Sequence, residues 1–190
     1  MRSSLGLAAL LAALTACSTA PHSNSVPKTT TVPTPNAATR HAVANLASAS
    51  GSLVSGRLLL ASTPSGVRIS GDIGGLQPNA QHGFHIHEKG DCSAVDGSAA
   101  GGHFNPDKKP HGRVGAGPHH AGDSDNIVAD TQGVAHLNIV LNGISLGSGA
   151  GNDVANRALI VHAVADDYTS QPAGNAGARV ACGVIRLSQP

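Results

Sequence analysis

Histidine is concentrated in one part of this 190-residue chain, because seven of its eleven histidines lie between His82 and His120. Two of the seven, His85 and His87, are separated by a single residue. On a β-strand their imidazoles would point from the same face and could chelate one metal ion. Histidines with this spacing are also common as ordinary buried or surface residues. The pair therefore predicts a metal site only together with further ligands.

A second group of candidate ligands follows along the chain, with gaps of 8, 9 and 3 residues: His103, His111, His120 and Asp123. Three imidazoles and one carboxylate suit a tetrahedral zinc site. His162 lies within an apolar strand-like run, and in isolation it would be interpreted as a hydrogen-bonded core histidine. Near the other histidines a ligand is the better interpretation, because a neutral imidazole in a buried strand needs a partner.

The composition excludes several functions. The net charge is +1, and aromatic residues make up 2% of the chain, with no Trp. A duplex-binding protein needs a basic patch, and a single-strand binder needs aromatic stacking platforms, so we expect no nucleic-acid partner. There are three cysteines, an odd number that needs an explanation.

The first residues predict export. A positively charged start is followed by the apolar run Leu5–Leu14, which is too short to span a bilayer but suits a signal peptide. The run ends in Leu-Thr-Ala-Cys, which resembles a bacterial lipobox, so residues 1–16 are predicted to be removed and Cys17 to be acylated. The alternative is an ordinary signal peptide cleaved near Ala16 or Ala20. In an oxidising compartment Cys92 and Cys182 can then form a disulfide.

Residues 17–40 are rich in Ser, Thr and Pro and predict a flexible tether, whereas residues 41–190 predict one all-β domain. Its short apolar runs alternate with turn residues and suggest a sandwich or barrel without a convincing helix. The eight expected strands are Ala42–Leu46, Leu53–Ser62, Val67–Ile73, Gly83–His87, Ile127–Ala129, Val134–Leu141, Ala158–Ala163 and Val180–Leu187. Two connections, Glu88–Asn126 and Val164–Ala178, are too long for hairpin loops, and such loops are usually functional.

Five segments in this order resemble the copper/zinc superoxide dismutases of the exported bacterial type: Gly83–Glu88, Gly101–Pro106, His120–Asp123, His162–Asp167 and Gly174–Ile185. The resemblance covers about His41 to Leu187 and implies an eight-stranded Greek-key β-sandwich, or flattened barrel, with two long functional loops. It implies copper ligands His85, His87, His103 and His162, and zinc ligands His103, His111, His120 and Asp123, so that His103 bridges the two metals. It further implies that Asp166 links His85 to His111, that Arg179 stands at the mouth of the copper site, and that Cys92 pairs with Cys182.

The function implied by this resemblance is disproportionation of superoxide to O₂ and H₂O₂. One copper and one zinc per subunit would serve as cofactors, with His103 and Arg179 as the catalytic residues. The enzyme would be a lipoprotein held to a bacterial membrane through acylated Cys17, in the periplasm or cell envelope, where it would defend against oxidative stress. A homodimer is possible. Two other functions stay open: a lipoprotein that stores copper or zinc, and a structural lipoprotein stabilised by metal.

Some neighbouring residues are expected to stay outside the site. His119 is an alternative ligand to His120, but the spacing of three residues to Asp123 favours His120. His82 is expected to be structural and His136 to face solvent. Residues 163–178 contain no Lys or Arg, whereas many members of the resembled family carry cations there that attract superoxide. Attraction of the substrate would then depend on Arg179, or on cations of the other long loop.

Overall fold

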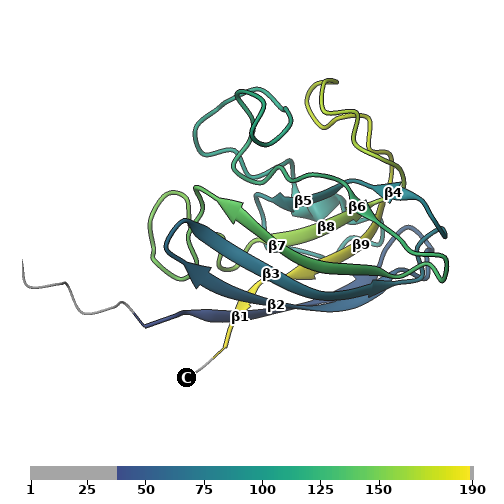
Figure 1. Cartoon of the computed structure of the whole chain (residues 1–190), viewed down its shortest axis with the longest axis horizontal. Coiled ribbons are helices and arrows are strands. Elements are labelled where there is room, and N and C mark those ends of the chain that lie inside the picture. Colours follow the sequence, from purple (N-terminus) through teal and green to yellow (C-terminus); the bar gives the residue numbers. More distant parts are fainter. Residues whose placement is uncertain (1–37, 189–190) are drawn as a thin grey trace, which may run out of the picture. The chain divides into compact units, whose positions relative to one another are not determined.

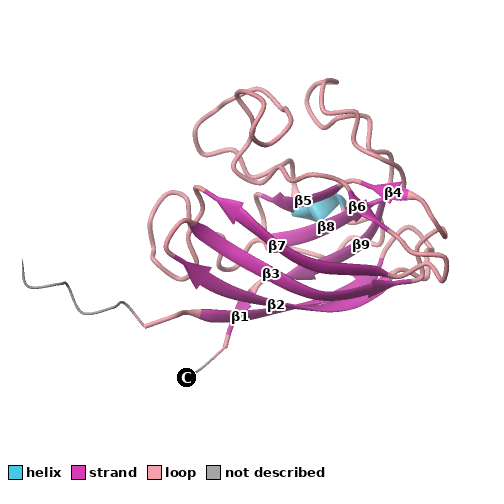
Figure 2. Ribbon diagram, in the orientation of Figure 1, coloured by secondary structure: helices cyan, strands magenta, loops and turns pink. Residues whose placement is uncertain are grey.

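The computed structural model describes residues 38–188, and almost every regular element in it is a β-strand (Figures 1 and 2). The only helix among these residues is the single 3₁₀ turn Ser98–Ala100, and none is long and apolar enough to cross a membrane. The strands are β1 His41–Ser48, β2 Ser55–Thr63, β3 Gly66–Gly74, β4 Gln81–His82, β5 Phe84–His87, β6 Ile127–Val128, β7 Ala135–Asn142, β8 Ala158–His162, β9 Arg179–Val184 and β10 Arg186–Leu187. The predicted signal peptide and most of the tether lie outside the described residues.

Eight of the strands form one sheet that curls around the core (Figure 1). The order is β5-β8-β9-β1-β2-β3-β7, and β10 pairs with β1 beside β9. β3 pairs with β7 and β1 pairs with β9, so strands distant in sequence are neighbours in the sheet. β4 and β6 make a separate two-stranded pair. The predicted all-β Greek-key fold is confirmed.

Period-two alternation explains which side chains enter the core. On β7, Ala135, Leu137 and Leu141 are buried, while His136 between them faces solvent as expected. On β5 all four residues are buried. Phe84 and Ile86 join the main hydrophobic cluster, and the alternating histidines are covered by loops instead. This strand therefore connects the core to the predicted metal centre.

The strand boundaries differ from prediction where backbone groups change partner. The predicted strand Val180–Leu187 breaks at Ile185, whose N–H donates to the carbonyl of Arg157 at 2.8 Å and whose carbonyl accepts from Asn156 at 2.9 Å. Beyond this break, β10 pairs with β1. At the start of β2, Leu53 is 86% exposed and stays outside the strand. These pairings are tertiary, so the local pattern carried no sign of them.

The two long connections leave the sheet on the same side of the domain (Figure 1). We call residues 88–126 the first loop and residues 163–178 the second loop. The first loop begins after β5 and the second after β8, and these strands are hydrogen-bonded neighbours. Because the two strands are antiparallel, the loops start at opposite ends of the pair, and the first loop runs back along β5 to contact the second.

The predicted disulfide is confirmed, because Cys92 and Cys182 are bonded with their Cα atoms 5.7 Å apart. The bond joins the first loop to β9 across a sequence separation of 90 residues. In the chain-entropy model, closing so long a loop removes much of the freedom of the unfolded chain. The disulfide therefore stabilises the fold and tethers the first loop.

Replacing both cysteines, Cys92→Ala with Cys182→Ala, should lower the free energy of unfolding by roughly 4–5 kcal/mol for a loop of this length. Denaturant unfolding of the metal-free variant and parent measures the difference, and reduction of the parent should reproduce it. Two reactive thiols in the folded, oxidised parent would contradict this account.

Candidate metal centre

Six histidines and one aspartate come together in two groups beneath the loops. The first group is His85, His87, His103 and His162, and the second is His103, His111, His120 and Asp123. Within each group the candidate ligand atoms lie within 4.8 Å of one another, and all seven residues are buried. The two groups coincide with the predicted ligand sets and share His103. The neighbouring His119 belongs to neither group.

The strands supply three of these histidines. His85 and His87 share one face of β5, opposite the core side chains Phe84 and Ile86. His162 ends β8, where the pairing with β9 shifts register: Val161 lies opposite Ala181, but His162 lies opposite Arg179. A bulge of this kind redirects a side chain locally. It brings the last histidine of β8 and the predicted arginine to the same end of the sheet.

The first loop supplies the remaining ligands because it runs along the open edge of β5. The backbone of Ile86 accepts from Phe104 N–H at 2.8 Å and donates to the carbonyl of Gly122 at 2.9 Å. The carbonyl of Phe104 also accepts from Gly122 N–H at 2.9 Å. A side chain at Gly122 would overlap the Ile86 carbonyl, so glycine is required for this approach. These bonds hold His103, beside Phe104, and Asp123, beside Gly122, against β5.

One ring nitrogen of each predicted histidine ligand is buried without a hydrogen-bond partner. These atoms are Nδ1 of His85, His111 and His120, and Nε2 of His87, His103 and His162. Buried polar atoms without partners are rare, and a set that converges in this way needs an explanation such as a bound ion. Nitrogen donors of this kind suit copper and zinc. The residues therefore fit two metal ions that share one imidazole.

Burial keeps the imidazoles in the form that binds metal. Desolvation lowers the pKa of His87 to about 2, of His162 to about 3 and of His103 to about 4. For His103 the hydrogen bond to Asp123 acts in the opposite direction but is outweighed. Neutral imidazoles have the free lone pair that a metal requires, so the site is ready for an ion near neutral pH.

Asp123 organises the second group. Its Oδ1 accepts from Nδ1 of His103 at 2.8 Å, and its Oδ2 accepts from the backbone N–H of His120 at 2.8 Å. Nδ1 of His111 and of His120 lie 3.1 and 3.2 Å from its oxygens without hydrogen-bond geometry, as expected for ligands that converge on an ion. Burial alone would raise the pKa of Asp123, but these hydrogen bonds outweigh it and hold the pKa well below its usual range.

Asp166 connects the two groups from the second loop. Its Oδ2 accepts from Nε2 of His85 at 2.8 Å, and its Oδ1 accepts from Nε2 of His111 at 3.0 Å. These bonds use the outer nitrogens and leave Nδ1 of both rings turned toward the groups. Burial opposes the ionised form of Asp166, but the hydrogen bond from His85 lowers its pKa overall. A carboxylate in this role fixes ring orientation and makes the imidazoles stronger ligands.

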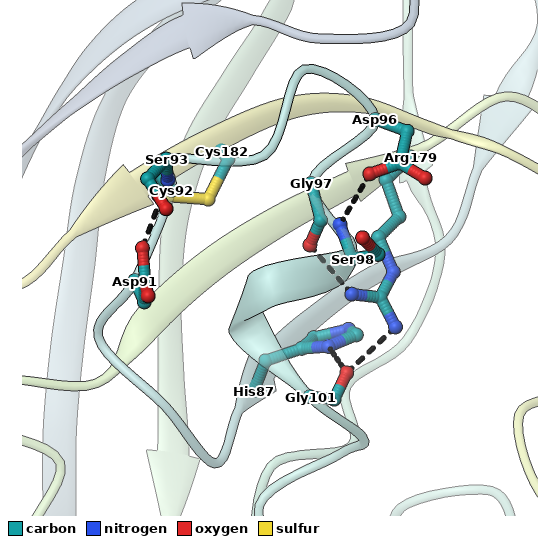
Figure 3. Close-up of a disulfide and its surroundings, with 10 residues drawn as sticks. All are labelled: His87, Asp91, Cys92, Ser93, Asp96, Gly97, Ser98, Gly101, Arg179 and Cys182. Atoms are coloured by element: carbon teal, nitrogen blue, oxygen red, sulfur yellow. Dashed lines mark hydrogen bonds between the residues drawn. A yellow bond between two sulfur atoms is a disulfide. The ribbon is translucent and has the colours of Figure 1, made fainter.

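Arg179 lies beside His87 of the first group, on the same strand as Cys182 of the disulfide (Figure 3). Its guanidinium donates to the carbonyls of Gly97 and Gly101, both at 2.6 Å. The Gly101 carbonyl also accepts from Nδ1 of His87 at 2.9 Å. One carbonyl thus holds both the arginine and a ligand ring, and Nε2 of His87 stays free.

Sequence reasoning missed several supporting contacts. Arg157 lies 3.6 Å over the ring of Phe104 and donates to the carbonyl of Glu88 at 2.6 Å, so it joins two segments that carry ligands. His82 is buried, as its expected structural role suggested, and its Nδ1 lies 2.9 Å from the carbonyl of His162. Most such contacts involve backbone atoms, which leave no pattern of residue types in the sequence.

Comparison with known proteins identifies relatives across most of the β domain. The family described as copper/zinc superoxide dismutase matches residues 54–185. The chain is 44% identical over 136 residues to superoxide dismutase [Cu-Zn] 2 of Aquifex aeolicus, a match that covers 70% of this chain and 80% of the relative. It is 46% identical over 128 residues to the extracellular superoxide dismutase [Cu-Zn] of Haemonchus contortus, covering 64% and 67%. The crystal structure of a SOD-like protein from Bacillus subtilis superposes with a TM-score of 0.68 at 36% identity, covering 75% of this chain and 96% of that protein.

The free energy of unfolding of the metal-free protein should rise with pH between about 4 and 6.5. In this range the histidines bind protons in the unfolded chain, but the buried histidines of the folded protein stay neutral. Each such histidine adds a slope approaching ~1.4 kcal/mol per pH unit, and the gain levels off above 6.5. Denaturant unfolding across this range measures the slope, which His87→Gln should reduce.

His136 provides the control of opposite sign. Hydrogen bonding to Asp72 raises the pKa of this exposed histidine, so its contribution is present below 6.5 and is lost as pH rises through the raised pKa. The variant His136→Gln should therefore leave the rise between about 4 and 6.5 nearly unchanged and remove a decline in stability above 6.5. A pH-independent stability of the parent between 4 and 6.5 would contradict the assignment of neutral buried histidines.

Proposed function

The chain belongs to the copper/zinc superoxide dismutase family, and from this membership we propose which residues carry its reaction. The protein is a superoxide dismutase with copper and zinc as cofactors. Two superoxide ions and two protons become one O₂ and one H₂O₂. One superoxide is oxidised and the other reduced, so no external electron donor is needed.

We assign copper to the first group, His85, His87, His103 and His162. When bound, copper supplies the one-electron redox chemistry that zinc lacks. The observation that carries this assignment is the shared ring of His103. Its Nδ1 faces Asp123 and its Nε2 is buried without a partner, while its centroid lies 4.0 Å from that of His85. The same ring can therefore serve both groups.

We assign zinc to the second group, His103, His111, His120 and Asp123. Three imidazoles and one carboxylate would supply four protein ligands, the number typical of a structural zinc site. Asp123 contacts every other member of this group. Zinc bound here would hold the first loop against β5 and keep the shared ring oriented. In this proposal Nε2 of His103 would take up a proton only while it is not engaged as a copper ligand and would pass that proton to the product, while Nδ1 stays turned toward the zinc group.

Arg179 is the residue that we propose receives superoxide. A guanidinium stays charged at every physiological pH and can orient a small anion through two donors. Two other cations of the first loop are paired with acids, since Lys109 lies 2.9 Å from Asp107 and Arg113 lies 3.2 Å from Asp125. With no Lys or Arg in the second loop, local attraction depends mainly on Arg179.

Three substitutions test these assignments. His162→Ala should abolish turnover and remove copper while most zinc stays bound. Asp123→Ala should release zinc but keep some copper-dependent activity, because three copper ligands survive. Arg179→Ala should keep both metals and lower the rate at least about tenfold, with a weaker dependence on ionic strength, because an attractive charge is gone. Turnover and metal content of each variant beside the parent measure these effects.

The same experiment separates the enzyme from a storage protein. A protein that only stored metal would show no superoxide turnover in the parent, so Arg179→Ala would have no rate to change. Normal turnover of His162→Ala at unchanged copper content would show that His162 is not a ligand.

We also propose that the protein is exported as a lipoprotein anchored through Cys17 in the cell envelope. The disulfide supports export, because such bonds persist in oxidising compartments. One relative is itself described as extracellular. Residues 1–16 would be the signal peptide and residues 17–40 the tether that holds the enzyme near the membrane. In this location it would remove superoxide from the envelope.

Mass spectrometry of the membrane fraction tests the anchor. The mature chain should begin at Cys17 and carry added acyl mass, and Cys17→Ser should release the protein into the soluble fraction. A soluble chain that starts at another residue, or a free thiol at Cys17, would contradict the lipoprotein assignment.

A further inference from the structure

The backbone of one predicted zinc ligand is paired with a side chain from the second loop. His111 lies outside every strand, although it is buried. Its N–H donates to Oε1 of Gln171 at 2.9 Å, and its carbonyl accepts from Nε2 of Gln171 at 2.8 Å. A buried backbone needs partners for both of its polar groups. The Gln171 amide hydrogen-bonds to both groups, as the backbone of a neighbouring strand would do in a sheet.

A second amide makes the same contact in the opposite direction. Asn126, at the end of the first loop, accepts from the N–H of Asp166 through Oδ1 at 2.8 Å and donates to its carbonyl through Nδ2 at 2.9 Å. Each loop thus contributes one side-chain amide that hydrogen-bonds to the backbone of the other loop. The two residues so held, His111 and Asp166, also contact each other at 3.0 Å.

Both ring nitrogens of His111 already have assigned directions. Nε2 contacts Asp166, and Nδ1 faces Asp123 at 3.1 Å. The ring can satisfy both only if its backbone is held at one position. The space beside it is also closed, because a side chain at Gly174 would overlap both Asp166 and the His111 ring. The Gln171 amide is the contact that holds this backbone from the second loop.

We propose that Gln171 is a positioning residue for the zinc half of the centre. By pairing with both backbone polar groups of His111, it fixes that ring between Asp123 and Asp166 and couples the second loop to zinc binding. This inference rests on the proposed zinc assignment. The competing explanation is that Gln171 only stiffens its own loop.

The test compares two neighbouring substitutions in the full chain. Gln171→Met keeps the size of the side chain but removes both bonds to His111. Ser170→Ala is the matched control, because it removes contacts with Asp167 and Asn175 inside the second loop and none with His111. Zinc affinity is measured by competition with a chromophoric chelator. Gln171→Met should bind zinc roughly tenfold or more weakly, as do other losses of support behind a ligand. The zinc affinity of Ser170→Ala and the copper affinity of both variants should stay within about twofold of the parent by the same reasoning.

Two further readouts separate positioning from general stiffening. Cobalt bound in place of zinc should show an altered visible spectrum in Gln171→Met, because one ligand ring has moved. Gln171→Glu keeps the acceptor but loses the donor, so it should give an intermediate zinc affinity. Tyr168 is the only tyrosine in a chain without Trp, and its hydroxyl accepts from the backbone of Asn126 at 2.9 Å, so its fluorescence reports whether the loops stay together.

Parent zinc affinity in Gln171→Met, or equal losses in Gln171→Met and Ser170→Ala, would overturn the proposal. A failure of the zinc assignment itself would give a different result. In that case Asp123→Ala would also bind zinc with the affinity of the parent. If Gln171→Met folds poorly, shown by changed copper affinity or changed tyrosine fluorescence, Gln171→Glu decides: an unchanged cobalt spectrum and zinc affinity would overturn the proposal.

Discussion

The ring of His103 imposes the strictest demand on this structure. Both of its nitrogens are buried, and they point in different directions, with Nδ1 toward Asp123 and Nε2 without any protein partner. Burying a polar group without a partner costs free energy. The ring is therefore stable only where each of its nitrogens has a polar or charged partner. A site that brings one group of donors to each nitrogen satisfies this demand. The rest of the domain keeps those two groups at a fixed separation.

The sheet and the loops each contribute to this fixed separation. β5 and β8 present His85, His87 and His162 from hydrogen-bonded backbone, which is rigid. The first loop would be free to move, but it is paired along β5 and tethered to β9 by the disulfide. Asp166 then joins one imidazole from each group across the loops. The two groups of candidate ligands are consequently parts of one network.

The sequence allowed much of this to be predicted, for identifiable reasons. Alternation on the strands indicated which faces are buried, and the spacing of His103, His111, His120 and Asp123 suggested one group of ligands. The role of Asp166 and the pairing of the cysteines came from family resemblance, since nothing local indicates such distant partners. The bulge beside His162 and the contacts of Gln171 with backbone atoms were missed. They depend on register and on main-chain groups, which leave no trace in the order of residue types.

The central claim is that one imidazole joins a copper ion and a zinc ion in this chain. Diffraction from crystals of the protein loaded with both metals, recorded at the copper and zinc absorption edges, tests it most directly. The account predicts one copper peak among His85, His87, His103 and His162, and one zinc peak among His103, His111, His120 and Asp123. Two metals that share no histidine, or a single mixed peak, would contradict it.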